Sequence, residues 1–358
     1  DEAVAAAMLG ASINYPMRGA VTWKSIVGTN VAADALSNLA SAGVKGGAMI
    51  IVGEDYGEGS SIIQERSHAY AMKSAMCLLD PRPELPTIVR MVEQGFALSE
   101  ASNMPAILEL RIRACHVYGR FETRDNPAPG ISRNNPIETA DFNFSRVCLP
   151  PATYGQEKHK IAYRLPAAMA YIREHGLNER FDGEVENIGV IVQGGIYNTL
   201  MRGLAQLGLA DAYGHSALSV LVLNVTYPLV AEEIAAFSAG RDAVLVVEEG
   251  QPEFIEQAIN AILRKADINT PVVGKDVLPM AGEYTSEVML RGLTDFLGLH
   301  APAGKDVAAA VVRVETQLTE KQELAASLGA DLPPRTPSFC TGCPERPVFS
   351  ALKIMERE

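Results

Sequence analysis

The chain contains few cysteines, few aromatic side chains and no long hydrophobic run. Of its 358 residues, five are cysteine and one is tryptophan, and aromatic residues make up 6%. Five irregularly spaced cysteines are too few for the disulfide framework of a secreted scaffold. No apolar run approaches the roughly 20 residues that a membrane-spanning helix needs. These absences argue against a disulfide scaffold and a membrane protein, and the default compartment is the cytoplasm.

Positive charge is also scarce. The chain has 31 lysines and arginines against 43 aspartates and glutamates, which gives a net charge of -12. An acidic surface repels a phosphate backbone, so we expect no nucleic-acid partner. Hydrophobic residues at 47% and charged residues at 21% are an ordinary globular balance. This length predicts two or three domains.

The two ends of the sequence predict that it is a piece of a longer protein. The chain opens without methionine, at Asp1-Glu2, directly before an apolar run. Near the other end, Cys340 and Cys343 form a Cys-x-x-Cys pair that no cysteine or histidine follows. Zinc and iron–sulfur clusters generally take four protein ligands, so this pair is half of a site.

Strand and helix patterns alternate along two blocks of the sequence. In the first block we expect strands at 19–23, 48–53, 76–79 and 106–112, with helices at 30–42 and 84–100 among the connections. In the second block we expect strands at 188–192, 218–223 and 243–247, with helices that begin near 196, 230 and 253. Continuous apolar strands that alternate with helices predict parallel α/β sheets. Residues from about 119 to 155 and from 300 to 338 are rich in proline and polar residues and indicate linkers.

Several short segments together resemble one enzyme family. They occur in the family's order over nearly the whole chain, and the chain therefore resembles the α subunits of indolepyruvate:ferredoxin oxidoreductases, which are thiamine-diphosphate-dependent 2-oxoacid:ferredoxin oxidoreductases. The segments are Gly28–Asp34, Gly43–Gly47, Thr226–Leu229, Val246–Glu249, Gly274–Pro279 and Phe339–Arg346.

The resemblance implies a division into domains. Residues 1–118 would form an α/β pyrimidine-binding domain that is truncated at its N-terminus, and 119–155 a linker. Residues 156–300 would form a transketolase C-terminal-like α/β domain, and 301–338 a second linker. Residues 339–358 would be the start of a truncated pyrophosphate-binding domain.

The resemblance also implies an activity. The complete enzyme would oxidatively decarboxylate an arylpyruvate such as indolepyruvate to an acyl-CoA, with coenzyme A as cosubstrate. Electrons would pass through [4Fe-4S] clusters to ferredoxin. Thiamine diphosphate would be the cofactor, with Mg²⁺ whose ligands lie outside this chain. Partners would be a β (γ-type) subunit or fused domain and a second α subunit in a dimer, and the fragment alone would be inactive.

Two other functions stay open. One is a non-redox thiamine-diphosphate enzyme related to decarboxylases or transketolases, which would contain no iron–sulfur cluster. The other is a non-catalytic assembly or regulatory subunit that kept the fold. Fold alone does not decide among them.

Glu2 is the candidate catalytic and cofactor-binding residue. In the family, a carboxylate in an Asn/Ser-Glu-x-x-Ala-like run binds ring nitrogen N1′ of thiamine, and Asp1–Ala5 matches that run. The alternative is a glutamate that favours the helix macrodipole in a first turn.

Arg66 and three polar residues complete the candidate site. Arg66 lies where the family places an arginine for the substrate carboxylate, which a guanidinium binds bidentately; the alternative is a surface arginine paired with Glu65 or Glu58. Thr22, Lys24 and Asn30 flank the expected place of the aminopyrimidine. Their alternative is the ordinary polarity of a strand end and a helix cap.

Cys340 and Cys343 have two interpretations within the family. In pyruvate-type relatives the matching pair helps to hold a [4Fe-4S] cluster, whereas in the indolepyruvate branch the main clusters lie in a separate ferredoxin-like domain. The sequence also departs from this branch at Glu345, where relatives usually have histidine. The identity of the 2-oxoacid therefore stays open.

Overall fold

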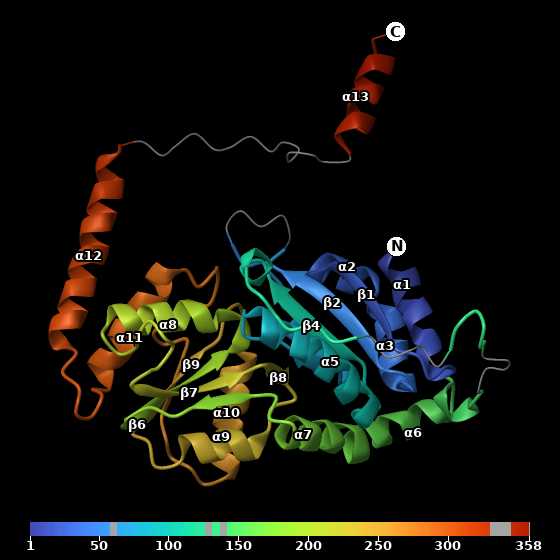
Figure 1. Ribbon diagram of the computed structural model, residues 1–358, viewed down its shortest axis with the longest axis horizontal. Coiled ribbons are helices and arrows are strands. Elements are labelled where there is room, and N and C mark those ends of the chain that lie inside the picture. Colours follow the sequence, from blue (N-terminus) through green and yellow to red (C-terminus); the bar gives the residue numbers. More distant parts are fainter. Residues whose placement is uncertain (58–62, 126–130, 137–141, 330–344, 358) are drawn as a thin grey trace. The chain divides into compact units, whose positions relative to one another are not determined.

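The chain forms two parallel-type α/β sheets with helices on their faces (Figure 1). The computed structural model describes residues 1–57, 63–125, 131–136, 142–329 and 345–357. These residues divide into two units, 1–315 and 316–358, which are described separately. Both sheets lie in the first unit. The predicted class, α/β with parallel sheets, is confirmed.

The first sheet has five strands in the order β1-β2-β4-β3-β8. All neighbouring pairs are parallel except β3 with β8. The strands are β1 (Gly19–Lys24), β2 (Ala48–Glu54), β3 (Cys77–Leu79), β4 (Ala106–Arg111) and β8 (Val225–Tyr227). The sequence predicted the first four within two residues at each end, but not β8.

Helices cover both faces of the first sheet. One face packs with α1, α3 and α4, which bury Leu9, Leu36 and Ala71 against strand residues such as Ile50. The opposite face packs with α5 and α7. The helices of this half are α1 (Glu2–Leu9), α2 (Ser25–Val31), α3 (Ala33–Ala42), α4 (Ser67–Ser74), α5 (Leu85–Ser102), α6 (Ala152–His159) and α7 (Leu165–Glu174).

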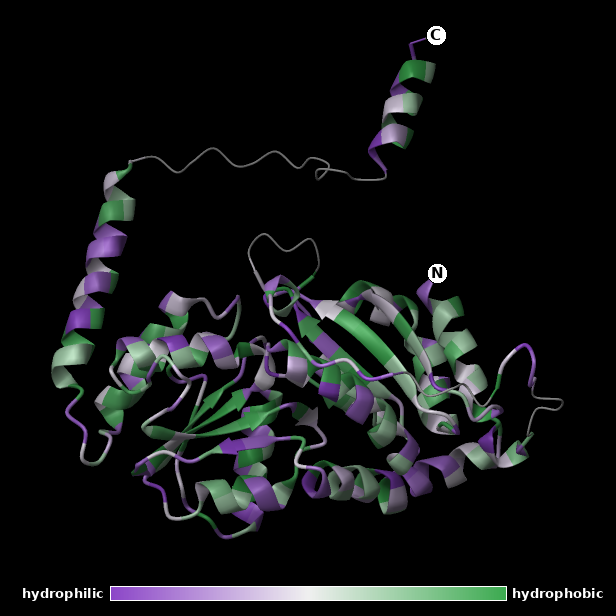
Figure 2. Ribbon diagram, viewed as in Figure 1, coloured by the Kyte–Doolittle hydropathy of each residue, from purple (hydrophilic) through white to green (hydrophobic). Residues whose placement is uncertain are grey.

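The second sheet has the strand order β10-β9-β6-β7-β5, in which only β5 runs antiparallel to its neighbour. Strands β7 and β9 are buried throughout, as their continuous apolar sequences predicted. Figure 2 shows strands of both sheets in the green of hydrophobic residues. The strands are β5 (Glu179–Phe181), β6 (Val185–Gln193), β7 (Leu218–Leu223), β9 (Ala243–Val247) and β10 (Val272–Val273).

Four helices flank the second sheet. The pair α9 and α10 covers one face with Ile234, Phe237 and Ile259, and α8 packs with α11 on the other side (Figure 1). The helices are α8 (Tyr197–Gln206), α9 (Ala231–Ser238), α10 (Phe254–Lys265) and α11 (Ser286–Leu299). The three helix starts that the sequence predicted near 196, 230 and 253 agree with α8, α9 and α10 within one residue.

The two sheets are joined by more than a linker. Directly after β7, the buried Asn224 leads into β8, which pairs with β3 in the first sheet. The carbonyl group of Asn224 accepts a hydrogen bond from the backbone N–H of Asp80 (2.8 Å), the residue that follows β3. A strand from the predicted second domain thus completes the sheet of the first, and the carboxyl ends of β3 and β7 meet here.

The segment predicted as a second linker, 301–338, contains a helix. Helix α12 spans Ala308–Ser327, so much of the segment is regular rather than irregular; its alanine and glutamate content favours a helix. Helix α13 spans Arg346–Met355 in the second unit, with Val348, Phe349 and Leu352 exposed. No helix among the described residues is long and apolar enough to cross a membrane.

Candidate functional site

Buried charges gather where the carboxyl ends of the two sheets face each other. We call this group the carboxyl-end cluster. Each member has at most 4% of its surface exposed, which is rare for charged residues unless they are paired. Its members are Glu54, Tyr56, Arg66, Asp80, Glu109, Arg111, Glu248 and Glu249.

Strand register places the charges of the first sheet on one face. In the parallel pair β2–β4, Val52 lies opposite Glu109 and Glu54 lies opposite Arg111. Because side chains alternate between faces with a period of two, all four point to the same side of the sheet. This is the side that α3 and α4 cover, and the charges occupy the end of an otherwise apolar layer.

Arg111 binds carboxyl groups from both sheets. Its Nη2 lies 2.8 Å from Oδ2 of Asp80 and 3.0 Å from Oε1 of Glu109, and its Nη1 donates to Oε2 of Glu249. Burial raises the pKa of Asp80 to about 6, although the Arg111 guanidinium opposes this shift. Gly195 N–H also donates to Asp80 (3.1 Å). Arg111 therefore holds the two sheets together electrostatically.

Arg66 makes the second connection between the sheets. Its Nη1 donates to Oε1 of Glu248 (2.5 Å) and to the carbonyl oxygen of Pro252 (2.6 Å), and its guanidinium lies over the ring of Phe254. The surface alternative is wrong, because Arg66 is buried; Glu58, one of its two expected partners there, lies outside the described residues. A substrate carboxylate would have to compete with Glu248 for the guanidinium.

Glu248 and Glu249 are surrounded by N–H donors. Glu248 accepts from the backbone N–H groups of Ile255 and Glu256 at the start of α10 (3.0 Å each), a favourable place for a carboxylate. Glu249 accepts from Arg113 Nη2 (2.8 Å) and from the backbone N–H of Tyr284 (2.5 Å). These N–H groups replace water as hydrogen-bond partners, which offsets the cost of burying two carboxyl groups.

Lys275 forms hydrogen bonds with the backbone of the segment that carries Glu248 and Glu249. Its Nζ lies within hydrogen-bond distance of the carbonyl oxygens of Glu248 (2.6 Å) and Gly250 (3.0 Å) and of the Tyr284 hydroxyl (2.7 Å). Burial lowers the pKa of Lys275 to about 8. Gly250 has φ +84°, and a Cβ there would lie 2.9 Å from the Tyr56 ring, so this turn requires glycine.

His68 lies beside the cluster without a charge of its own. Its ring stacks on Phe254 (centroids 5.3 Å apart), and its Nδ1 has no hydrogen-bond partner among the described residues. Burial, with the Arg66 charge, lowers the pKa of His68 well below its ordinary value. The imidazole is therefore neutral at physiological pH.

The other predicted site residues lie on neighbouring elements at the opposite edge of the first sheet. Glu2 is half-buried in the first turn of α1, which packs against β1 and α2. Thr22 and Lys24 are exposed on β1, and Asn30 on α2 accepts a hydrogen bond from the Tyr70 hydroxyl (2.5 Å). The structure brings these elements together, and α2 also packs against α4, which begins directly after Arg66.

No metal site is formed by the described residues: none of their histidine, cysteine, aspartate and glutamate side chains form a group of three or more suited to a metal ion. Cys340 and Cys343 lie outside the described residues. The predicted cluster site is therefore not examined by the structure and stays a prediction.

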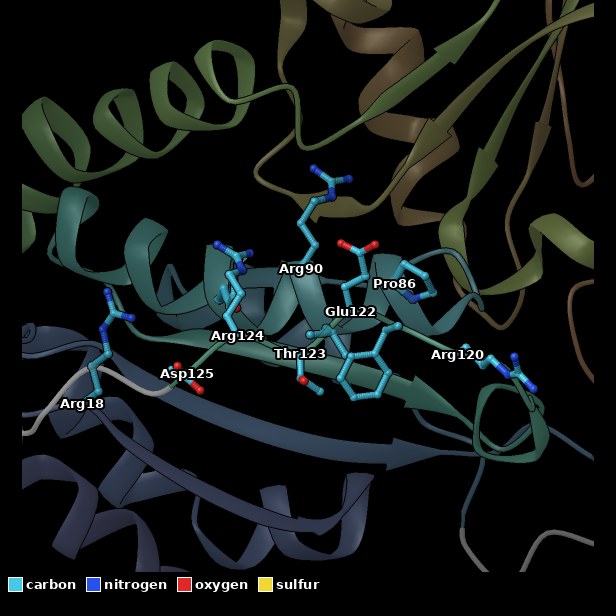
Figure 3. A pocket seen from close by; sticks show the side chains of 11 residues that line it. Arg18, Pro86, Arg90, Arg120, Glu122, Thr123, Arg124 and Asp125 are labelled. Atoms are coloured by element: carbon cyan, nitrogen blue, oxygen red, sulfur yellow. Dashed lines mark hydrogen bonds and ion pairs between the residues drawn. The ribbon is translucent and has the colours of Figure 1, made fainter.

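Two cavities differ sharply in size and in charge balance. A cavity of about 10 Å³, large enough for about one water molecule, lies within the cluster against Glu54, Arg111 and Glu249. An open groove of about 1440 Å³ runs between α5 and residues 120–125 (Figure 3). Figure 3 shows several arginines along it, but Arg18 and Arg124 are paired with glutamates, so the groove carries little uncompensated charge.

Sequence reasoning missed most of the carboxyl-end cluster. One signal was present: Glu54, Glu109 and Arg111 each occur at the end of a strand whose other residues are apolar. A charge in such a position must be buried with a partner or exposed at the edge. Which of the two applies depends on the second sheet, which supplies Glu248 and Glu249.

Comparisons with known proteins agree with the resemblance seen in the sequence. Residues 178–323 match the indolepyruvate ferredoxin oxidoreductase middle domain. The chain is 28% identical over 93% of its length to indolepyruvate oxidoreductase subunit IorA of Methanothermobacter thermautotrophicus, and 27% identical to that of Pyrococcus abyssi. It spans about half (48%) of the length of these relatives. The predicted resemblance to this family is confirmed.

A solved structure has a similar fold. A chain of 2-oxoglutarate:ferredoxin oxidoreductase from Magnetococcus marinus superposes with a TM-score of 0.53 over 82% of this chain and 56% of its own, at 16% sequence identity. That structure contains 2-oxoglutarate, coenzyme A and succinyl-CoA. At this identity the likeness establishes the fold.

Proposed function

We propose that this chain is part of a thiamine-diphosphate-dependent 2-oxoacid:ferredoxin oxidoreductase. The observation that carries the proposal is the collinear similarity to IorA subunits over 93% of the chain. The shared fold with a 2-oxoglutarate:ferredoxin oxidoreductase supports it. An arylpyruvate such as indolepyruvate is the proposed substrate, and coenzyme A and ferredoxin are the proposed cosubstrate and electron acceptor. We propose that the chain works with a β-type partner, fused or separate, in a dimer of α subunits.

The residues proposed to bind the thiamine aminopyrimidine lie at the β1 edge of the first sheet. A carboxyl group on α1, a hydroxyl group on β1 and an amide group on α2 lie on adjoining elements and offer the donors and acceptors that such a ring needs. In this proposal the Glu2 carboxyl group would hydrogen-bond N1′, and Thr22, Lys24 and Asn30 would orient the ring. The cofactor, when bound, supplies the nucleophilic carbon that attacks the 2-oxoacid carbonyl group.

The remaining parts of the enzyme are assigned to the rest of the protein. The relatives are about twice as long as this chain, so the Mg²⁺ and diphosphate ligands and the [4Fe-4S] clusters are proposed to lie there. Cys340 and Cys343 stay candidates for a cluster. The 358 residues alone are then expected to be inactive.

The test uses the complete protein with its β-type partner. Purified without oxygen, it should reduce a dye when given an arylpyruvate and coenzyme A. Glu2→Gln removes the ionisable carboxyl group at N1′ and should lower kcat on the order of a hundredfold or more. Glu232→Gln is the matched control, because Glu232 is also acidic in a first helical turn, that of α9, and should leave the rate unchanged.

Three outcomes would contradict the proposal in different ways. If the protein fails to reduce the dye with every arylpyruvate that is tried, the proposed substrate class is wrong. Decarboxylation without dye reduction, in protein that lacks iron absorbance, indicates a non-redox thiamine enzyme. An unchanged rate in Glu2→Gln supports an assembly role for this chain.

A further inference from the structure

Two buried glutamates in the first sheet lie side by side. Glu54 ends β2, and Glu109 lies near the end of β4 on the same face of the sheet. They are 2% and 3% exposed, and they lie on adjacent paired strands, two register positions apart on the same face. Two carboxylates so close in a dry environment repel each other strongly, so one of them is driven to take a proton.

The two carboxyl groups have different partners. Oε1 of Glu54 accepts from the backbone N–H of Ser67 (2.8 Å), in the first turn of α4, and from the Ser25 hydroxyl (3.3 Å). Oε1 of Glu109 lies 3.0 Å from Arg111 Nη2 but lacks hydrogen-bond alignment. Oε2 of Glu54 also has no hydrogen-bond partner among the described residues. Donors favour the ionised form, so Glu54 is the better carboxylate and Glu109 the better acid.

The charge balance of the cluster favours an added proton. Five buried carboxyl groups face two buried arginines, a difference of three negative charges if all were ionised. The half-buried Arg113, Lys275 and Glu283 together add one positive charge, which leaves an excess of two negative charges. Uncompensated buried charge is costly, and protonation of a carboxyl group is the ordinary way to remove it.

We propose that Glu54 and Glu109 hold one proton between them, resident on Glu109, and that this proton keeps Glu54 in place as the acceptor that positions the start of α4. In this arrangement the Glu109 hydroxyl donates to Glu54, and Glu54 receives Ser67 N–H. Arg66, the residue before α4, is positioned with it. Glu109 is thus a positioning residue. The inference goes beyond the proposed function and needs no cofactor.

The charged and titratable groups around the pair are consistent with this assignment. Arg111 faces it from β4, Arg66 from the start of α4 and Tyr56 from the loop after β2. Asp80 lies on the far side of Arg111. Burial, and then the Glu54 charge, raise the pKa of Glu109 well above its ordinary value, against the opposing effect of Arg111.

The proton makes stability depend on pH in a defined direction. A carboxyl group whose pKa is raised by folding binds its proton more tightly in the folded state. Its stabilising contribution is complete below the unfolded pKa and is lost as pH rises towards the folded pKa. Asp80 contributes in the same direction, but only up to about pH 6. The range from neutral pH upward therefore isolates the glutamate pair.

The experiment compares the unfolding of the chain with that of its Glu109→Gln variant from neutral to alkaline pH. Glutamine mimics the protonated acid and can donate to Glu54, so the variant should fold and lack the proton. The ratio of its folding equilibrium constant to that of the parent should rise by about tenfold per pH unit. The ratio cancels groups common to both proteins, including Lys275. Glu186→Gln, an exposed glutamate on β6, is the control and should give a constant ratio.

The single tryptophan supplies a second measurement. Trp23 lies opposite Val52 in the sheet, and Val52 is two residues before Glu54 on β2. The Trp23 Nε1 donates to the Thr29 hydroxyl, and that hydroxyl donates to the carbonyl oxygen of Ser25. The Trp23 fluorescence should change when the pair loses its proton, at alkaline pH, in the parent and in Glu186→Gln. The change should be absent in Glu109→Gln.

A stability ratio that stays constant above neutral pH would overturn the proposal. If Glu109→Gln does not fold, infrared spectroscopy of the parent chain decides. The C=O stretch of a protonated carboxyl group should be present at neutral pH, where Asp80 is ionised, and should disappear at alkaline pH. Its absence at neutral pH overturns the proposal as well.

Discussion

The carboxyl ends of the two sheets bury acidic side chains in opposite ways. At the second sheet, every carboxylate oxygen of Glu248 and Glu249 accepts from an N–H donor. At the first sheet, Glu54 and Glu109 each keep an oxygen atom without a hydrogen-bond partner among the described residues. In our proposal the glutamate pair at the first sheet holds a proton. The local supply of donors influences the state of a buried acid together with burial itself, which raises the pKa of the fully hydrogen-bonded Asp80.

The largest expected effect comes from replacing Arg111, which binds carboxyl groups at the ends of both sheets. Arg111→Met leaves Asp80, Glu109 and Glu249 without their shared cation in a buried site. We expect a loss of about 3–5 kcal/mol in the free energy of unfolding, the usual effect of breaking a buried ion pair. Denaturant titration measures it. Arg124→Met, in an exposed pair with Glu93, should cost less than about 1 kcal/mol; equal effects would contradict the comparison.

A pH titration below neutrality separates Asp80 from the glutamates. The pKa of Asp80 is raised to about 6, so its stabilising contribution is present at low pH and is lost as pH rises through about 6. The loss should be on the order of 3 kcal/mol. Asp80→Asn should reduce the dependence between the ordinary aspartate pKa and neutrality, and the part that survives should be removed by adding Glu109→Gln. A dependence that survives in the double variant belongs to another group.

The close packing between the carboxyl ends of the two sheets can be tested by adding a methyl group at Gly195. A Cβ at Gly195 would lie 2.3 Å from Asp80 Oδ1 and 2.5 Å from Arg111 Nε. Gly195→Ala should therefore destabilise the chain by about 1–3 kcal/mol. Gly298 has no atom within 4 Å of its Cβ position and is exposed on α11, so Gly298→Ala should stabilise by about 0.5–1 kcal/mol. Thermal unfolding of both variants shows whether each substitution lowers or raises the stability of the chain.

The smallest effect concerns reactivity. Cys77 is buried on β3, and burial raises the pKa of its thiol to about 12, whereas Cys115 is exposed just beyond β4. A thiol reagent should label Cys115 rapidly and Cys77 only after unfolding. Peptide mass spectrometry distinguishes the two sites. Rapid labelling of Cys77 in the folded chain would show that the first sheet opens readily.

Local patterns predicted the sheets well and their assembly poorly. Apolar runs such as 218–223 and 243–247 give the strands of the second sheet with the correct bounds, because a strand buried on both faces must be apolar throughout. The three-residue strand β8 is too short and too polar to be recognised, and only its pairing with β3 makes it a strand. The helix α12 was missed because the region was assigned from the prolines and polar residues around it.

The candidate site divides in the same way. The sequence placed Glu2, Thr22, Lys24 and Asn30 through a resemblance that the comparisons confirm, and their roles remain proposals. For Arg66, the sequence suggested a substrate carboxylate or a surface partner. In the structure Arg66 pairs with Glu248, which is 182 residues away in the chain, and its role towards a substrate carboxylate stays a prediction.

The sequence by itself determined that this chain is an acidic α/β protein of two sheets, related to a known oxidoreductase family. Periodicity and composition are local properties, and they suffice for that. Only the tertiary structure decided that the carboxyl ends of the two sheets share one buried set of charges. The state of each carboxyl group depends on donors brought from distant parts of the chain, and no local pattern records them.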